Sequence, residues 1–147
     1  MAYNAGSVAG YIGLGFLADA VGRKPVTIAY FLFSLLATPV LFLWTHNLRL
    51  LVMVSAIVGF FGSGQLTWLA VWLPELYPTR MRATAVGFIF NGPRLIAAGG
   101  TLMAGTLIVR FGGYGHAAVI VSTIYLLGLA AGPFLPETRG KPLPETV

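Results

Sequence analysis

The chain has 147 residues, of which 57% are hydrophobic and 9% are charged, and its formal net charge is +5. Soluble domains carry about 25% charged residues, so this composition excludes a water-soluble fold and indicates a membrane protein. The basic residues lie at the ends of apolar runs and form no single stripe, which argues against nucleic-acid binding. The chain has no cysteine, and His46 and His116 have no partner at metal-ligand spacing, so we expect no metal and no cofactor.

Five apolar runs approach the length of about 20 residues that a helix needs to cross a bilayer. Short polar loops separate them, which predicts antiparallel neighbouring helices in one all-α transmembrane domain over residues 1–147. The predicted helices cover residues 2–17, 26–44, 48–73, 83–109 and 116–135, and a tail follows at 136–147.

Lysine and arginine are distributed unequally between the two sides of these runs. Six of them fall in the loops at 18–25 and 74–82 and in the tail, whereas the opposite side holds two, Arg49 and Arg110. The side that is richer in lysine and arginine is usually cytoplasmic. The sequence therefore predicts an external N-terminus and a cytoplasmic C-terminus.

The first run contains a glycine pattern that also occurs in nucleotide-binding enzymes. Residues 13–18 read GLGFLA and fit the G-x-G-x-x-G/A dinucleotide fingerprint, which requires a βαβ unit and an acidic residue about 20 positions on. No acidic residue lies between Asp19 and Glu75, and the chain shows no alternation of strands and helices. We therefore interpret these glycines, together with Gly6 and Gly10, as sites of close helix packing.

The loop after the first run combines charge with turn chemistry. Asp19 and Arg23 are four residues apart, which suits an ion pair on a helix. Gly22 permits a tight reversal, and Pro25 suits the first turn of the next helix. A carboxylate near that helix start is also favoured by the helix dipole.

Three loop motifs resemble those of the major facilitator superfamily. Residues 15–25 (GFLADAVGRKP) resemble its G-x-L-x-D-x-x-G-R-[KR] loop signature. Residues 74–82 (PELYPTRMR) and 136–143 (PETRGKPL) resemble the loops after the tenth and twelfth spans of its sugar-porter-like and organic acid:proton symporter branches. The resemblance implies a conformational latch in these loops, made of Asp19, Gly22, Arg23, Lys24, Glu75, Arg80, Arg82, Glu137 and Arg139.

The resemblance maps the chain onto spans eight to twelve, a partial C-terminal half of a twelve-helix fold. It implies a secondary transporter of a small organic anion or sugar-like metabolite, coupled to protons, in a bacterial inner membrane. Its partners would be the bilayer, the solute, protons and a missing N-terminal half. It would not be an enzyme, and it would work by alternating access. The alternative is a small polytopic membrane protein with a structural or assembly role and no transport activity.

Arg94 is the charged residue inside the predicted spans. Charge at membrane depth is costly and marks either a solute pathway or a paired interior position. Asn91 lies three residues earlier on the same helix face, and Pro93 is expected to kink the helix. Arg94 and Asn91 are therefore candidates for binding a carboxylate, although pairing of Arg94 with an acid in the missing half, or packing of Arg94 against carbonyl groups, explains the pattern equally well.

Gln65 and Trp68 are a second pair of candidate binding residues. They are three apart on the third predicted helix and could offer a hydrogen bond and an aromatic wall to a solute. Alternatively, Gln65 joins two helices and Trp68 anchors the chain at the lipid interface. For Trp72 the interface position is the preferred interpretation.

Overall fold

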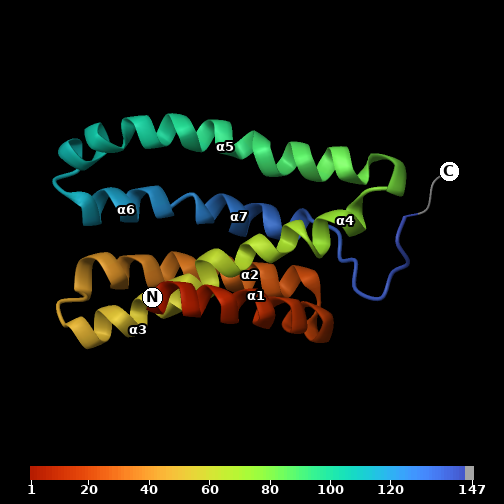
Figure 1. Cartoon of the computed structure of the whole chain (residues 1–147), viewed down its shortest axis with the longest axis horizontal. Coiled ribbons are helices and arrows are strands. Elements are labelled where there is room, and N and C mark those ends of the chain that lie inside the picture. The colour runs from red at the N-terminus through yellow and green to blue at the C-terminus, as the bar shows by residue number, and fades with distance from the viewer. Residues whose placement is uncertain (145–147) are drawn as a thin grey trace.

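A computed structural model of the chain describes residues 1–144, so the last three residues of the predicted tail lie outside the described residues. The described part is a bundle of long helices that lie side by side, with the turns gathered at its two ends (Figure 1). Residues 1–144 contain no strand. The all-α prediction is therefore confirmed.

The first two helices meet at a single glycine. α1 (Ala2–Val21) ends at Gly22, whose φ of 125° suits glycine, and α2 begins directly after it. α2 (Arg23–Pro39) continues as a π-helical turn, η1 (Val40–Trp44), after its internal proline. α1 ends four residues after its predicted run and α2 begins three residues before its own, because the helical backbone of both continues into the charged loop.

The third membrane segment is helical along most of its length, but the helix type changes from α to π, then to 3₁₀ and back to α. Asn47 begins it by accepting a hydrogen bond from the backbone of Arg49, an ordinary N-cap. Irregular winding inside a membrane is tolerated where protein surrounds the backbone. The segment is made of α3 (Leu48–Val58), the π-helical η2 (Gly59–Ser63), the 3₁₀ turn η3 (Gln65–Leu69) and α4 (Trp72–Leu76).

The last two membrane segments differ in regularity. α5 (Thr79–Arg110) is one helix of 32 residues, unbroken at Pro93. The final segment consists of α6 (Tyr114–Ser122), α7 (Tyr125–Ala131) and the short turn η4 (Gly132–Phe134). Glycines 112 and 113, with φ of 74° and 136°, allow the chain to reverse between α5 and α6.

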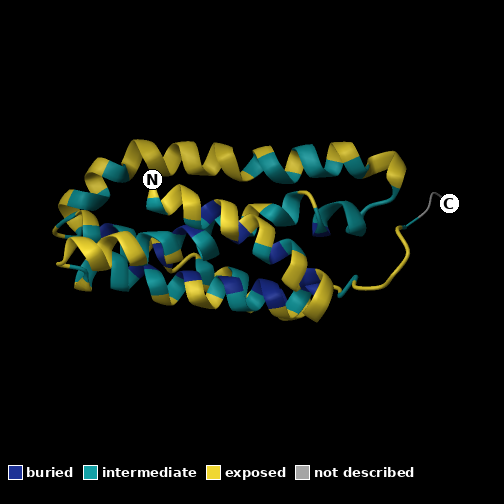
Figure 2. Cartoon of the chain, turned by 60° about the horizontal axis from the view of Figure 1, so that its bottom comes forward, coloured by how far each residue is buried: buried dark blue, intermediate teal, exposed yellow. Residues whose placement is uncertain are grey.

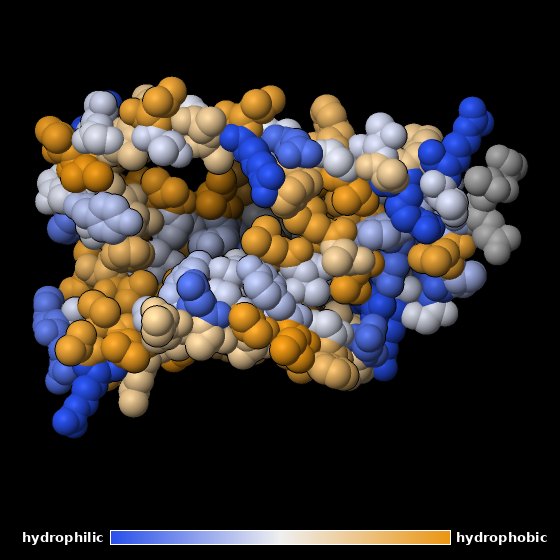
Figure 3. All heavy atoms as spheres, viewed as in Figure 1, coloured by the Kyte–Doolittle hydropathy of each residue, from blue (hydrophilic) through white to orange (hydrophobic). Residues whose placement is uncertain are grey.

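Four segments of the described chain are long and apolar enough to cross a membrane. α1 has 20 residues but is not among them, because Asn4, Ser7 and Asp19 lower its mean hydropathy. On the face shown in Figure 3, hydrophobic side chains cover much of the middle, and hydrophilic ones gather toward the two ends. The four segments are Arg23–Trp44, Leu48–Leu76, Thr79–Arg110 and Tyr114–Phe134.

The tightest packing joins α1 to the third segment, and the two run parallel. A Cβ atom added at Gly6 would overlap the carbonyl oxygen of Ala56, and one added at Gly10 would overlap that of Phe60. The prediction that Gly6 and Gly10 pack closely is therefore confirmed. Gly15, from the dinucleotide-like pattern, has no atom within 4 Å of its added Cβ and contributes nothing to this contact.

The core lies between α1, α2 and the third segment. Leu14 and Ala18 of α1 meet Val26 and Tyr30 of α2, and three partly buried aromatic residues close the cluster: Phe60, Phe61 and Trp68. α5 contrasts with this core because none of its residues is buried (Figure 2). Its glycines at 87, 92, 99, 100 and 105 all face open space. One long side of the bundle is thus left uncovered by residues 1–144.

Candidate functional site: a charged cluster that joins three loops

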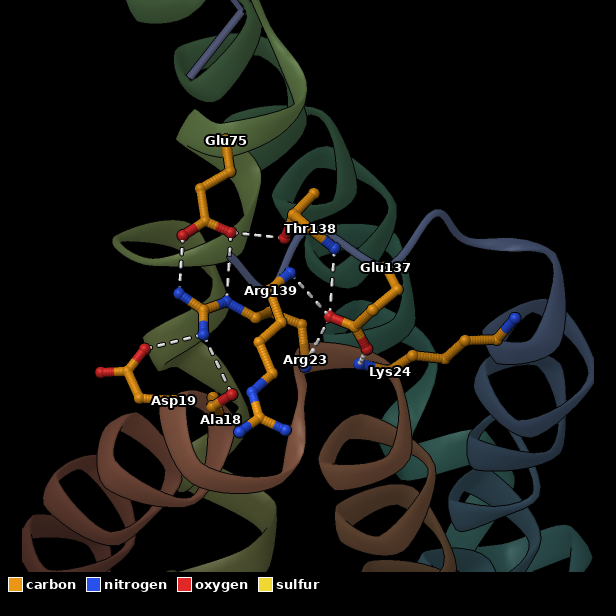
Figure 4. Close-up of polar contacts among 8 residues, drawn as sticks. All are labelled: Ala18, Asp19, Arg23, Lys24, Glu75, Glu137, Thr138 and Arg139. Carbon is orange, nitrogen blue, oxygen red and sulfur yellow. Dashed lines mark hydrogen bonds and ion pairs between the residues drawn. The ribbon is translucent and has the colours of Figure 1, made fainter. Parts of the chain in front are cut away.

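Charged side chains from three loops meet at one end of the bundle (Figure 4). We call Asp19, Arg23, Glu75, Glu137 and Thr138 the loop cluster. These residues come from the end of α1, the start of α2, α4 and the tail after η4, and their contacts join residues up to 114 apart in sequence. All three loop motifs identified in the sequence contribute to it.

Arg23 is the centre of the loop cluster and is 9% exposed. Its Nε and Nη2 donate to the two carboxylate oxygens of Glu75 at 3.2 and 2.8 Å, a bidentate pair. Its Nη1 forms an ion pair with Asp19 at 2.7 Å and donates to the carbonyl of Ala18 at 3.0 Å. The predicted ion pair between Asp19 and Arg23 is therefore confirmed, and Glu75 is the stronger partner.

The tail fixes the other side of the Glu75 carboxylate. The hydroxyl of Thr138 donates to Oε2 of Glu75 at 2.5 Å. That oxygen also accepts from Arg23, so the tail and the start of α2 share one carboxylate. Thr138 was missed in the sequence reasoning, although it stands inside the P-E-T stretch that the third motif contains.

Glu137 caps the start of α2 from the tail. Its Oε1 accepts from the backbone N–H groups of Arg23, Thr138 and Arg139, and its Oε2 accepts from that of Lys24, all at 3.0 Å. These donors include two of the N–H groups that a helix start leaves unsatisfied. The carboxylate expected near this helix start is thus Glu137 and not Asp19.

The ionisation of Glu137 follows from these contacts. Burial of the carboxylate would raise its pKa, but the hydrogen bonds from the backbone N–H groups of Lys24, Arg139, Arg23 and Thr138 outweigh burial and lower the pKa. Glu137 therefore stays charged at neutral and mildly acidic pH, and its cap on α2 persists there.

Gly22 is required at this junction for two reasons. Its φ of 125° disfavours any other residue, and a Cβ atom there would lie 2.9 Å from Oε2 of Glu137. The glycine lets the tail carboxylate approach the backbone of the turn. The sequence analysis found the first reason but not the second.

Two of the predicted latch residues have no hydrogen bond or ion pair to the loop cluster among residues 1–144 and do not approach it as Gly22 does. Arg80 is exposed in the first turn of α5. Nε of Arg82 donates to the carbonyl of Tyr77 within its own loop at 3.3 Å. Lys24 and Arg139 take part through their backbone N–H groups. The predicted residues that do meet are Asp19, Gly22, Arg23, Lys24, Glu75, Glu137 and Arg139.

The four candidate binding residues fall into two separate places. Nε2 of Gln65 donates to the hydroxyl of Ser34 at 2.8 Å, which joins the third segment to α2. Trp68 packs against the core and makes an edge contact with Trp72, with ring centroids 5.2 Å apart. Trp72 is only 4% exposed, so its predicted position at the lipid interface is wrong. It lines an apolar pocket together with Trp68, Ile89 of α5 and Leu135, so neighbouring segments cover it.

Arg94 and Asn91 lie on the exposed helix α5. Arg94 is exposed, and its guanidinium carbon lies 3.7 Å from the ring centroid of Phe90. Nδ2 of Asn91 donates to the carbonyl of Gly87 at 2.8 Å. Within residues 1–144 no hydrogen bond or ion pair links this pair to Gln65 or Trp68.

The comparisons with known proteins agree with the three motifs. The model of the Major Facilitator Superfamily matches residues 1–146. The chain belongs to the major facilitator superfamily. The resemblance seen in the loop motifs is thereby confirmed, and the named relatives are transport proteins.

Three relatives show the range of solutes within this superfamily. A Haemophilus influenzae protein named for metabolite transport is 31% identical over 141 residues, which are 94% of this chain and 34% of that protein. A Cupriavidus pinatubonensis protein named for 4-methylmuconolactone transport is 30% identical over 92% of this chain and 32% of its own length. A Bacillus subtilis protein named for niacin and nicotinamide transport is 32% identical over 69% of this chain and 25% of its own length. The chain thus spans about a third or less of these relatives.

Proposed function

We propose that the chain acts as part of a secondary transporter that moves a small organic anion or sugar-like metabolite, coupled to protons, across a bacterial inner membrane. The similarity to bacterial transporters of metabolites and organic compounds supports this role. The helices would correspond to spans eight to twelve of a twelve-helix fold, with α1 as a fifth span beside the four apolar segments. A complementary N-terminal half would be the partner.

The observation that carries this proposal is the loop cluster. In alternating access, two helical halves rock against each other around a site near the midplane, so contacts at one end must form and break in each cycle. The loop cluster holds three loops together through charge-assisted hydrogen bonds centred on Arg23 and Glu75. It would act as a latch that stabilises the state in which its end of the transporter is closed.

The uncovered side of α5 supports the need for a partner. Arg94 stands midway along this helix and is exposed, and a cation facing lipid at that depth is costly. In the proposed transporter this side faces the solute pathway, where water, the complementary half or an anionic solute surrounds Arg94. Arginine suits a carboxylate because its N–H groups bind both oxygens at once.

We expect Arg94→Ala to abolish anion uptake in a transporter that contains this chain. The measurement is uptake of radiolabelled nicotinate, with nicotinamide as a neutral solute of the same ring. Nicotinate uptake should fall far more than nicotinamide uptake because only the carboxylate needs the cation. Arg82→Ala is the matched control and should slow uptake without changing KM, since Arg82 holds its own loop. Normal nicotinate uptake by Arg94→Ala would rule out the anion anchor.

We also expect the end that carries the loop cluster to face the cytoplasm. The chain has no cysteine, so single cysteines give a clean readout. Cysteines at Ala20 and Thr138 should resist an impermeant maleimide in intact cells, and one at Asn47, at the opposite end, should react. Labelling of Thr138→Cys from outside would reverse the proposed orientation.

A further inference from the structure

Phe90 lies directly beneath the guanidinium of Arg94. The two residues are one helical turn apart on α5, and the guanidinium carbon is 3.7 Å from the centroid of the phenyl ring. This is a close cation–π contact, well inside the limit of about 6 Å for such pairs. Asn91, the nearest polar side chain in sequence, donates instead to the carbonyl of Gly87.

We propose that Phe90 is a positioning residue that sets the plane of the Arg94 guanidinium for an anionic solute. At this distance the ring shields one side of the guanidinium, and within residues 1–144 the guanidinium N–H groups make no hydrogen bond. Those N–H groups lie in one plane, which matches the two oxygens of a carboxylate. This inference rests on the proposed function of Arg94.

The membrane environment strengthens the cation–π attraction between Arg94 and Phe90. A guanidinium in water gains little from an aromatic ring, but the attraction grows when water is removed. The ring also restricts the rotamers of a long side chain before the solute arrives, which lowers the entropy lost on binding. A leucine at position 90 would fill a similar volume but has no π-electrons to attract the cation.

A first experiment tests the contact in the chain itself. With 15N-labelled arginine in lipid nanodiscs, the Nε–H proton of Arg94, assigned through Arg94→Lys, should resonate upfield of the other arginines because it lies over a ring. Phe90→Leu should abolish this displacement, whereas Phe90→Tyr and Phe90→Trp should preserve it. Phe88→Leu is the matched control, because Phe88 is 76% exposed and lies elsewhere on α5, and it should change nothing. An Arg94 signal with no upfield displacement would overturn the contact.

A second experiment tests the role of the contact in transport. In a transporter that contains this chain, Phe90→Leu should raise KM for nicotinate roughly 2- to 30-fold, with kcat and nicotinamide uptake little changed. Phe90→Tyr should restore the nicotinate KM, because its ring keeps the π-electrons that attract the cation. An unchanged KM in Phe90→Leu would overturn the positioning role even where Arg94→Ala abolishes uptake. Failure of Arg94→Ala to alter nicotinate uptake would instead overturn the anion anchor in the proposed function.

Discussion

Replacing Gly10 by alanine is expected to prevent α1 from packing against the third segment. A single added methyl group at this position overlaps the carbonyl oxygen, carbon and Cα of Phe60, and backbone atoms cannot move aside as a flexible side chain can. Overpacking usually costs about 1–3 kcal/mol, and a clash with backbone belongs at or above the upper end. The carbonyl of Gly10 also accepts a hydrogen bond from the buried Tyr30 hydroxyl, so a shift of α1 would disturb the core.

The control for this prediction is Gly15→Ala in the same helix. Its added Cβ meets no atom within 4 Å, and alanine favours a helix over glycine by up to about 1 kcal/mol. The thermal midpoint of the purified chain in detergent, followed by circular dichroism, should fall sharply in Gly10→Ala. It should be unchanged or raised in Gly15→Ala. Equal midpoints in the two variants would show that α1 and the third segment do not pack as described.

Neutralising Glu75 is expected to destabilise the loop cluster much more than neutralising Asp19. Both carboxylates bind Arg23, but the side chain of Glu75 is 21% exposed and that of Asp19 is 71% exposed. Glu75→Gln removes one of the two hydrogen bonds from the Arg23 guanidinium, because an amide has a single acceptor oxygen. It also removes the negative charge of the group that accepts from the Thr138 hydroxyl. Breaking a fully buried pair costs about 3–5 kcal/mol, so partial exposure brings this loss to about 2–3 kcal/mol. Asp19→Asn should cost less than about 1 kcal/mol.

The measurement is proteolysis of the tail in detergent-solubilised chain. Opening of the loop cluster frees the backbone at Arg139, whose N–H group donates to Glu137, so tryptic cleavage after Arg139 reports the fraction of chains with an open loop cluster. Cleavage should accelerate strongly in Glu75→Gln and only slightly in Asp19→Asn. Faster cleavage in Asp19→Asn than in Glu75→Gln would contradict this prediction. It would show that Arg23 is held mainly by Asp19 and not by Glu75.

The sequence predicted the all-α class and the residues of the loop cluster well, for a physical reason. Apolar runs of membrane length and charged residues at their ends leave few alternatives in a bilayer. Gly6 and Gly10 were also recognised, because their spacing is that of a close helix contact. The pairing of Arg23 with Glu75 could not be read from the sequence, since it depends on how the third segment returns beside α2.

The mid-membrane residues were harder to predict. Spacing placed Gln65 and Trp68 on one helix face, but their partners, Ser34 and Trp72, follow from packing between segments. Trp72 was expected at the lipid interface because tryptophan is frequent there, and it lies buried instead. Phe90 and Arg94 are four residues apart, a spacing that brings two side chains together on one helix face, but only the structure shows that the guanidinium turns toward the ring.

The most direct test of the account is a reversible lock on the loop cluster in a working transporter that contains this chain. Lys24→Cys and Arg139→Cys suit a short, reducible thiol cross-linker, because the backbone N–H groups of both residues donate to the carboxylate of Glu137 and survive the substitution. In proteoliposomes, cross-linking this pair should stop uptake of the solute, and reduction should restore it. Single-cysteine variants should be unaffected by the same treatment. Complete cross-linking with uptake unchanged would contradict the account, because the loop cluster would then have no part in the transport cycle.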